Sequence, residues 1–295
     1  MSNFYVKSHV INISFYLIVL RRIYDMLELQ KKIEDSMSKC TDNKFWVQLL
    51  EYMYNSINRL SLENVFFLDF INMFESIDDK TNNIYWDMDF SKCFYELIPL
   101  QRYQLKILYE FIEYVESNLT DDIMALCEDE LFRGKKDIKW LIELDYFYQN
   151  LINNFAQVRQ LSRYEIINSN LKESFPDQEK YFTDLLHDTD WYNLSKNELL
   201  ALLQGYDFHY LSDKAYYFVL LACIKLCIDM FREDMISLPE EMYLFLKDKR
   251  RALHADIKIK KLVKDFIQLL SHKSYDFLTF SSDNLDKLMK IWATN

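Results

Sequence analysis

His187 and two carboxylates that follow it are residues of the types that could carry out acid–base chemistry. Asp188 and Asp190 place an imidazole beside acidic side chains. A carboxylate of this kind can orient a histidine that acts as a general base. The same residues are also typical of a solvated helix end, where they carry out no chemistry. We favour the solvated end, because the sequence contains no nucleophile elbow, phosphate loop or kinase-like set beside them.

Two cysteines, Cys223 and Cys227, have the spacing of neighbours on one helix face. Two thiolates could contribute to a metal site, but neither a histidine nor a second cysteine pair accompanies them, and a zinc site needs such ligands. The chain has 5 cysteines, an odd number, which argues against a framework of disulfide bonds in a protein of this size. We therefore predict buried free thiols, with no metal ion and no cofactor.

Residues 247–264 form the one strongly basic stretch of the sequence. Within it, Arg250, Arg251 and His254 are similar to the R-x4–6-H motif of the helical HEPN ribonucleases, although both arginines lie closer to the histidine than the motif requires. A solvated helix face explains this charge without any ligand. A surface that binds nucleic acid or an acidic partner is the alternative.

Acidic residues next to aromatic residues form the candidate partner-binding site. Tryptophan and tyrosine are enriched at protein interfaces, and carboxylates can meet arginine and lysine on a partner. Acids near helix N-termini also stabilise the helix dipole, which accounts in part for two of these residues, Asp87 and Asp89. The candidate residues are Tyr85, Trp86, Asp87, Asp89, Glu128, Asp129, Glu130, Asp184, Asp188 and Asp190.

The charge of the chain is negative and unevenly distributed. The 295 residues include 35 basic and 46 acidic side chains, which gives a formal charge of −11. Residues 51–200 hold 14 of the basic and 28 of the acidic side chains. This distribution argues against nucleic acid as a partner, because nucleic acids bind to positive faces. It favours a basic protein partner, although solubility alone is a simpler explanation.

The composition predicts an all-α fold. The chain contains only 2 glycines and 3 prolines, too few for the tight turns of a sheet-rich protein. Apolar residues instead recur at intervals of three and four, which predicts about 11–13 helices and no significant sheet. Two such stripes are Phe45, Leu49, Leu50, Met53 and Ile57, and Tyr103, Leu105, Leu108, Tyr109, Ile112 and Val115.

Several helix starts can be predicted from capping boxes, in which a serine is followed three residues later by a glutamate. These pairs are Ser162/Glu165, Ser195/Glu198 and Ser237/Glu240.

A boundary between two packed multi-helix domains is predicted at Gly134. This glycine is flanked by basic residues, as at a helix C-terminus that needs a left-handed residue. We expect a loop at 132–136, between an N-terminal helical domain at 1–134 and a C-terminal helical domain at 135–295.

The N-terminus contains an apolar run at 10–20 that ends at Arg21 and Arg22. This run is shorter than the roughly 20 residues that span a bilayer, and no signal-peptide cleavage site follows it. The apolar pattern continues through Met26 and Leu27. We predict a buried first helix in a cytoplasmic protein, with no membrane partner.

Five segments of the C-terminal half follow one another in a characteristic order. They are the F-x-x-V pair at 155–158, an acidic helix at 177–187, D-W-Y-N-L at 190–194, the capped entry to a buried helix at 210–218, and F-L-T-F at 277–280. From Asn150 onward this order resembles a family of uncharacterised bacterial helical domains, some of them encoded in toxin–immunity neighbourhoods. The resemblance implies a fold with Trp191 and Phe218 in its core. The family usually has a Leu-Pro-Ala kink where this chain reads Leu-Leu-Ala at 220–222, so we expect a straighter helix here.

These observations favour a protein that acts by binding and not as an enzyme. The expected function is an immunity protein that neutralises a cognate bacterial toxin, occluding its active site with an acidic, aromatic surface. The partner would be a protein toxin with a basic face. Two alternatives stay open: a helical nucleic-acid-binding protein or nuclease that uses residues 247–264, and a phage inhibitor of a host defence protein.

Overall fold

The fold is all-α, as the composition predicts. The computed structural model describes residues 21, 24–39, 44–59, 100–117, 121–168, 175–204, 207–232, 240–272 and 282–293. Within these ranges it contains 11 α-helices and no strand. Two isolated bridges in the same ranges pair Leu161 with His187 and Ile167 with Leu211.

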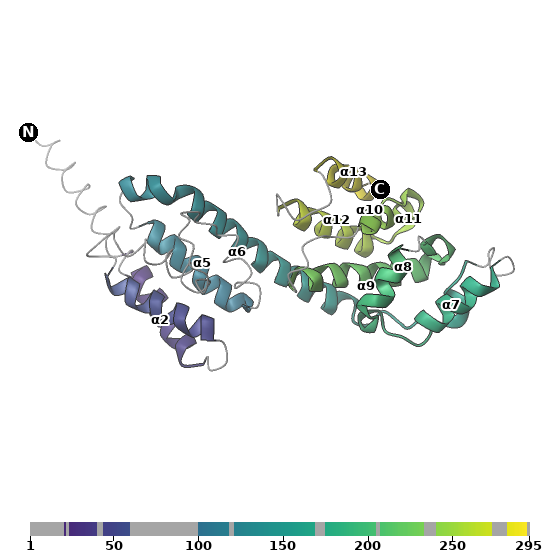
Figure 1. Cartoon of the computed structure of the whole chain (residues 1–295), viewed down its shortest axis with the longest axis horizontal. Helices are drawn as coiled ribbons and strands as arrows, with labels where there is room; N and C mark the ends of the chain where they lie inside the picture. Colours follow the sequence, from purple (N-terminus) through teal and green to yellow (C-terminus); the bar gives the residue numbers. More distant parts are fainter. Residues whose placement is uncertain are drawn as a thin grey trace, which may run out of the picture. The chain divides into compact units, whose positions relative to one another are not determined.

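Contacts divide the chain into two compact units, Met1–Ile142 and Glu143–Asn295. The first unit contains a helix at 24–37, followed by α2 (Lys44–Arg59) and α5 (Arg102–Glu116). The long helix α6 (Asp121–Phe155) begins in the first unit and ends in the second (Figure 1).

The helices of the first unit bury apolar faces that are close to those predicted. The buried members of the two stripes are Leu49, Leu50, Met53, Ile57, Leu105, Leu108, Ile112 and Val115. Tyr103 is 46% exposed, because it lies two residues before Leu105 and therefore on the opposite side of α5. The predicted burial of Leu27 is also wrong, since this side chain is 55% exposed while Leu29 and Ile33 are buried.

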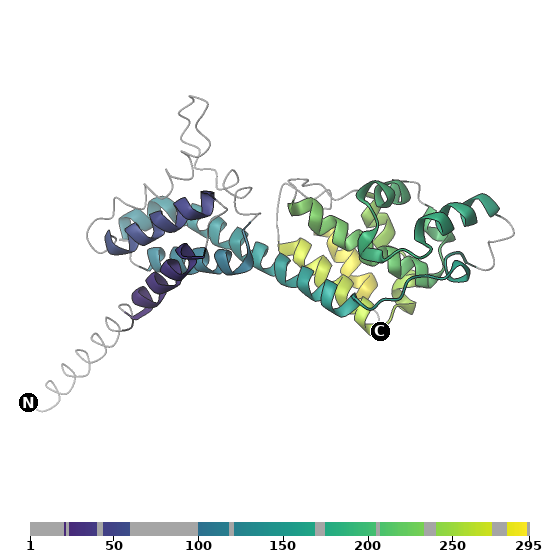
Figure 2. The same cartoon turned by 90° about the horizontal axis from the view of Figure 1, so that it is seen from below.

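The second unit continues with seven α-helices and three short 3₁₀ turns in its described residues. The helices are α7 (Pro176–Leu186), α8 (Lys196–Gln204), α9 (Asp213–Arg232), α10 (Glu240–Leu246), α11 (Lys249–His254), α12 (Ile257–His272) and α13 (Ser282–Ala293). The turns are η1 (Arg163–Glu165), η2 (Trp191–Asn193) and η3 (Asp207–Tyr210). Two of these helices, α12 and α13, lie side by side (Figures 1 and 2).

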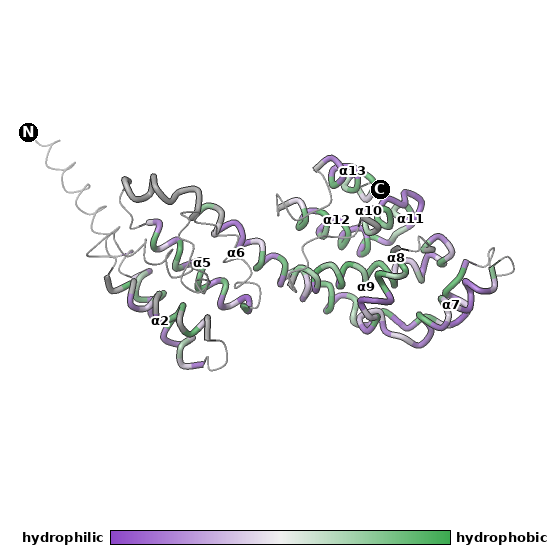
Figure 3. Tube along the Cα trace, in the orientation of Figure 1, coloured by the Kyte–Doolittle hydropathy of each residue, from purple (hydrophilic) through white to green (hydrophobic). Residues whose placement is uncertain are grey.

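Helix α9 supplies much of the core of the second unit. Its residues are mostly apolar, as Figure 3 shows, and it is buried almost continuously from Ala215 to Ile224. The helix is unbroken through 220–222, which agrees with the absence of a proline there. Trp191 and Phe218 are both buried, so their predicted core positions are confirmed.

Two of the three predicted capping boxes are present. The backbone N–H and the hydroxyl of Ser162 both donate to the Glu165 carboxylate at η1. At the start of α8 the backbone N–H of Ser195 donates to the Glu198 carboxylate, and the backbone N–H of Glu198 donates to the Ser195 hydroxyl. The third box, at Ser237, lies outside the described residues.

Buried aromatic side chains satisfy the carbonyls at several helix ends of the second unit. The indole of Trp191 donates to the carbonyl of Phe155, the last residue of α6, at 3.0 Å. The indole of Trp292 donates to the carbonyl of Leu246, the last residue of α10, at 2.8 Å. In many proteins a glycine ends the helix and lets backbone N–H groups bond to its last carbonyls. This chain has only 2 glycines, and its aromatic donors bond to some of these carbonyls instead.

The loop predicted at 132–136 is wrong. Helix α6 continues through Gly134, which is buried and does not adopt a positive φ. A glycine inside a helix costs only about 1 kcal/mol relative to alanine, and tertiary contacts of neighbouring residues can offset this cost. One such contact is the ion pair between Lys135 and Glu116 of α5, at 2.6 Å.

Candidate functional site

An acidic and aromatic face of α7 is the part of the candidate site that the structure shows most fully. Pro176 begins this helix, at a position where its missing N–H breaks no hydrogen bond. Phe182 and Leu186 are buried and anchor one side of α7 in the second unit. Asp177, Tyr181 and Asp184 follow the spacing of the opposite side, and all three are exposed.

The turn after α7 extends this acidic face. Asp188 is exposed and has a φ of 57°, a left-handed conformation that aspartate tolerates better than most residues. The Nδ1 atom of His187 lies 3.0 Å from an Asp188 carboxylate oxygen. We name Asp177, Tyr181, Asp184 and Asp188 together the acidic α7 surface. Tyr181 is 46% exposed and shares its side of α7 with Asp177 and Asp184, and also with the exposed Lys180.

Asp190 is half-buried and is held by two hydrogen bonds. The amide of Gln160 donates to Asp190 at 3.2 Å, and the hydroxyl of Tyr192 donates to it at 3.0 Å. The bond to Asp190 raises the pKa of Tyr192 above its ordinary value. The ring of Tyr192 is 40% exposed and packs edge-on against Trp191, with the ring centroids 5.7 Å apart. Asp190 therefore positions an exposed tyrosine, and is less available to a partner than Asp184.

Glu165 contacts residues from three segments of the second unit. Its carboxylate forms ion pairs with Arg159 and with Lys214, the latter at 2.8 Å. It also accepts two hydrogen bonds from Ser162. The hydrogen bonds from Lys214 and Ser162 lower the pKa of Glu165 to about 2. These contacts join the start of α9 to the segment that follows α6.

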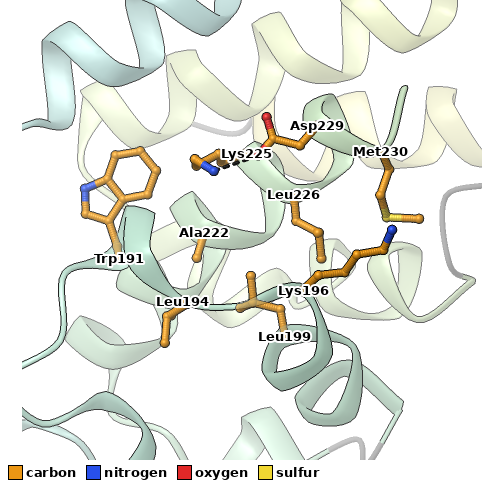
Figure 4. A pocket seen from close by; sticks show the side chains of 9 residues that line it. All are labelled: Trp191, Leu194, Lys196, Leu199, Ala222, Lys225, Leu226, Asp229 and Met230. Carbon is orange, nitrogen blue, oxygen red and sulfur yellow. Dashed lines mark hydrogen bonds and ion pairs between the residues drawn. The ribbon is translucent and has the colours of Figure 1, made fainter. Parts of the chain in front are cut away.

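A small pocket lies between η2, α8 and α9, with a volume of about 110 Å³. Figure 4 shows the indole of Trp191 at one end and the side chains of Lys196 and Met230 at the other. Lys225 and Asp229 line the wall between them and form an ion pair at 2.6 Å. The remaining walls are aliphatic. The lining contains no histidine, serine, threonine or cysteine, and its charged side chains are two lysines and one aspartate.

The basic stretch 247–264 places its two adjacent arginines in different environments. Arg251 is buried, its guanidinium lies 4.2 Å from the Tyr216 ring centroid, and it donates to the carbonyl of Leu211 at 2.8 Å. Burial lowers the pKa of Arg251 from its ordinary value. Arg250 is exposed and pairs with Asp213 at 3.1 Å. The Nδ1 atom of His254 lies 2.8 Å from the backbone carbonyl of Arg250.

The two cysteines of α9 are buried free thiols, as predicted. Burial raises the pKa of Cys223, and it raises that of Cys227 well above its ordinary value. In the part of the chain that the structure describes, no group of three or more His, Cys, Asp or Glu side chains could hold a metal ion. Among the same residues, no helix combines the length and the apolar content needed to cross a membrane.

The predicted partner-binding residues are not all brought together in the described structure. Tyr85, Trp86, Asp87 and Asp89 lie outside the described residues. Glu128, Asp129 and Glu130 lie in α6, and their side chains are not described. The remaining three, Asp184, Asp188 and Asp190, lie on or just after α7.

The sequence reasoning missed two residues of the acidic α7 surface, Asp177 and Tyr181. Their spacing from Asp184 places all three on one face of a helix, and this spacing could have revealed them. Asp177 and Tyr181 are four residues apart in the sequence, so they do not form an adjacent aromatic–acidic pair.

Comparisons with family models, with curated proteins and with solved structures find no match for this chain.

Proposed function

We propose that the protein is an immunity protein, which binds a cognate bacterial toxin and blocks its active site. The observation that carries this proposal is the acidic α7 surface, where Tyr181 is exposed on the same side of α7 as Asp177 and Asp184, and Asp188 is exposed in the turn that follows. Tyrosine contributes a large contact area at a low cost in conformational entropy, which suits it as an interface anchor. The resemblance of the C-terminal half to domains from toxin–immunity neighbourhoods supports the same function.

The negative charge of this surface favours a basic partner. The three carboxylates can accept hydrogen bonds from arginine and lysine, and the negative field of the chain accelerates the approach of a positive protein. A toxin that acts on nucleic acid has such a positive cleft, because it must bind phosphates. A standard interface buries about 800 Å² on each partner, more than these four residues offer, so neighbouring residues such as Tyr192 would take part.

Coexpression with the toxin encoded beside the gene tests this proposal. The wild-type protein should rescue growth and copurify with the toxin. The variant Tyr181→Ala/Asp184→Lys should weaken binding by about 100-fold, as expected for loss of an interface anchor and reversal of a charge. Lysine at position 184 suits the C-terminal end of α7, so the variant should stay folded.

A matched control changes the same residue types at other exposed positions. Tyr146→Ala/Asp286→Lys alters α6 and α13 and should bind the toxin as the wild type does. Absence of both rescue and a complex with the wild-type protein would contradict the immunity function. If the two double variants lose binding equally, the toxin does not bind the acidic α7 surface.

The described residues give less support to the nuclease alternative. A nuclease that used Arg251 would need it to reach substrate, but this side chain is buried against Tyr216. A phage inhibitor of a host defence protein would also act by binding, through the same surface. The genes beside this one distinguish a toxin from a host protein as the target.

A further inference from the structure

A second exposed surface of the unit Glu143–Asn295 combines apolar and positive side chains. Leu253 lies near the end of α11 and Ile257 begins α12, and these two aliphatic side chains are 53% and 83% exposed. Lys249, Arg250, Lys258 and Lys261 lie around them in the sequence and are also exposed. Ile257, Lys258 and Lys261 share one face of α12, because they are spaced by three and four residues. We name these six residues the basic α11–α12 surface.

The positive charge of this surface is compensated only in part, since the exposed Asp265 lies four residues after Lys261 on the same face of α12. The only carboxylates within residues 247–264 are Asp248 and Asp256, and both cap helices. Asp248 accepts from the backbone N–H of Arg251 at 3.1 Å, and Asp256 accepts from that of Ile259 at 2.8 Å. Arg250 pairs with Asp213. Among the described residues, the ion pairs include none formed by Lys249, Lys258 or Lys261.

An apolar centre with a charged rim is the arrangement found in protein interfaces. Nucleic acid fits this surface less well, because residues 247–264 contain no Phe, Tyr or Trp on which bases could stack. The acidic α7 surface carries the opposite net charge, with the exposed Tyr181 and Asp184 on α7 and Asp188 in the turn that follows, although Lys180 lies on the same face of the helix. The two surfaces lie on different helices of the same unit, and the ion pairs of the described residues include none between them.

We propose that the basic α11–α12 surface binds the acidic α7 surface of a second copy of this chain. Because the two surfaces differ, the contact is head-to-tail and leaves one free surface at each end of the assembly. The proposal shares the acidic α7 surface with the proposed immunity function, but it does not depend on a toxin. A toxin bound to that surface would compete with self-association.

Sedimentation velocity of the full chain tests the proposal at two salt concentrations. At about 50 mM salt the protein should form concentration-dependent, polydisperse oligomers, and at about 500 mM it should be monomeric, because salt screens surface charges. Two variants each remove the net charge of one surface. Lys258→Glu/Lys261→Glu sets two negative charges against Lys249 and Arg250, and Asp184→Lys/Asp188→Asn balances Asp177 while keeping a residue that tolerates positive φ at position 188.

Each variant alone should associate about tenfold more weakly than the wild type, because attractive charges are lost and one or two charges are reversed. An equimolar mixture of the two variants should form a one-to-one dimer, because each retains the surface that the other lacks. Lys287→Glu/Lys290→Glu on α13 is the matched control, with two exposed lysines, and should associate as the wild type does. Circular dichroism of all variants checks that they remain folded.

A wild-type protein that is monomeric at all concentrations and at low salt would overturn the proposal. So would a mixture of the two variants that stays monomeric while the wild type associates. Salt-sensitive binding of a single-stranded RNA oligonucleotide by a monomeric wild-type protein would assign the basic surface to nucleic acid instead. If the protein rescues cells from the toxin but does not self-associate, this inference fails and the immunity function stands.

Discussion

At the scale of single residues, Glu165 shows how a local motif acquires a long-range role. Its capping box with Ser162 is formed by residues three apart. Its ion pair with Lys214 joins residues 49 apart. The ion pair with Lys214 needs an ionised carboxylate, so protonation of Glu165 should weaken the link between η1 and α9.

The pH dependence of stability tests this role of Glu165. Its pKa falls from 4.5 to about 2 in the folded protein, and a lowered carboxylate pKa stabilises the fold above the unfolded pKa. The stability difference between wild type and Glu165→Gln should therefore be constant above about pH 6. It should shrink as the pH falls below 4.5 and disappear near 2. Urea unfolding at a series of pH values measures it.

The control for this prediction removes one partner of Glu165. In a Lys214→Met background, the substitution Glu165→Gln should change the free energy of unfolding by a smaller amount at every pH above 4.5. A difference that does not change with pH in the wild-type background would show that the carboxylate is not held in the charged form.

At the scale of elements, the ends of the helices depend on aromatic side chains from elsewhere in the chain. A helix leaves its last carbonyls without partners inside the helix. Trp191 and Trp292 supply partners for α6 and α10 from 36 and 46 residues away. The many aromatic residues therefore act as hydrogen-bond donors as well as core fillers.

Removing one of these indole donors should destabilise the protein. Trp191→Phe and Trp292→Phe keep an aromatic ring but leave a buried carbonyl without its partner, which costs about 1–3 kcal/mol. Thermal and urea unfolding measure the loss. Tyr192→Phe is the control, because it removes an exposed hydrogen bond and should change stability by less than about 0.5 kcal/mol. Equal losses for all three variants would contradict this role of the indoles.

The continuity of α6 gives a further prediction at Gly134. Proline inside a helix removes a hydrogen bond and clashes with the preceding turn, so Gly134→Pro should destabilise the protein by about 3 kcal/mol or more. In a loop the same change would cost much less. Gly134→Ala should retain the helical circular dichroism signal, because the glycine does not need a positive φ. If Gly134→Pro melted at the wild-type temperature, residue 134 would lie in a loop, as the sequence predicts.

At the scale of the whole molecule, the end of α6 belongs to the second unit. Phe147, Leu151 and Phe155 are buried, and the ring of Phe147 lies 5.9 Å from that of Phe266 in α12. Contacts assign these residues to the unit Glu143–Asn295. A fragment of the second unit therefore needs the part of α6 that begins at Glu143.

Two fragments test this assignment. Fragment 143–295 should unfold cooperatively on heating, because it keeps the contacts of the second unit. Fragment 156–295 lacks the buried apolar side chains at the end of α6, each worth about 1.5–3 kcal/mol, as well as the carbonyl that accepts from Trp191. It should lose cooperative unfolding. If both fragments melt alike, α6 does not contribute to the stability of the second unit.

Much of the candidate site depends on contacts between residues that are far apart in the sequence. Asp184, Asp188 and Asp190 could be selected from the sequence, because they are crowded acids near a tryptophan. The sequence does not show which of them is free to contact a partner, since Asp190 accepts a hydrogen bond from Gln160, 30 residues away. The same holds in the basic stretch, where adjacent Arg250 and Arg251 are respectively exposed and buried.

The sequence by itself determined the helical class, two capping boxes and most of two apolar stripes, because these depend on side chains within about four residues of each other. Only the tertiary structure decided that α6 runs through Gly134, that Arg251 stacks on Tyr216, and which charges face solvent. The physical reason is that burial depends on contacts between residues distant in the chain. Local periodicity shows which face of a helix is apolar, but it does not show what covers that face.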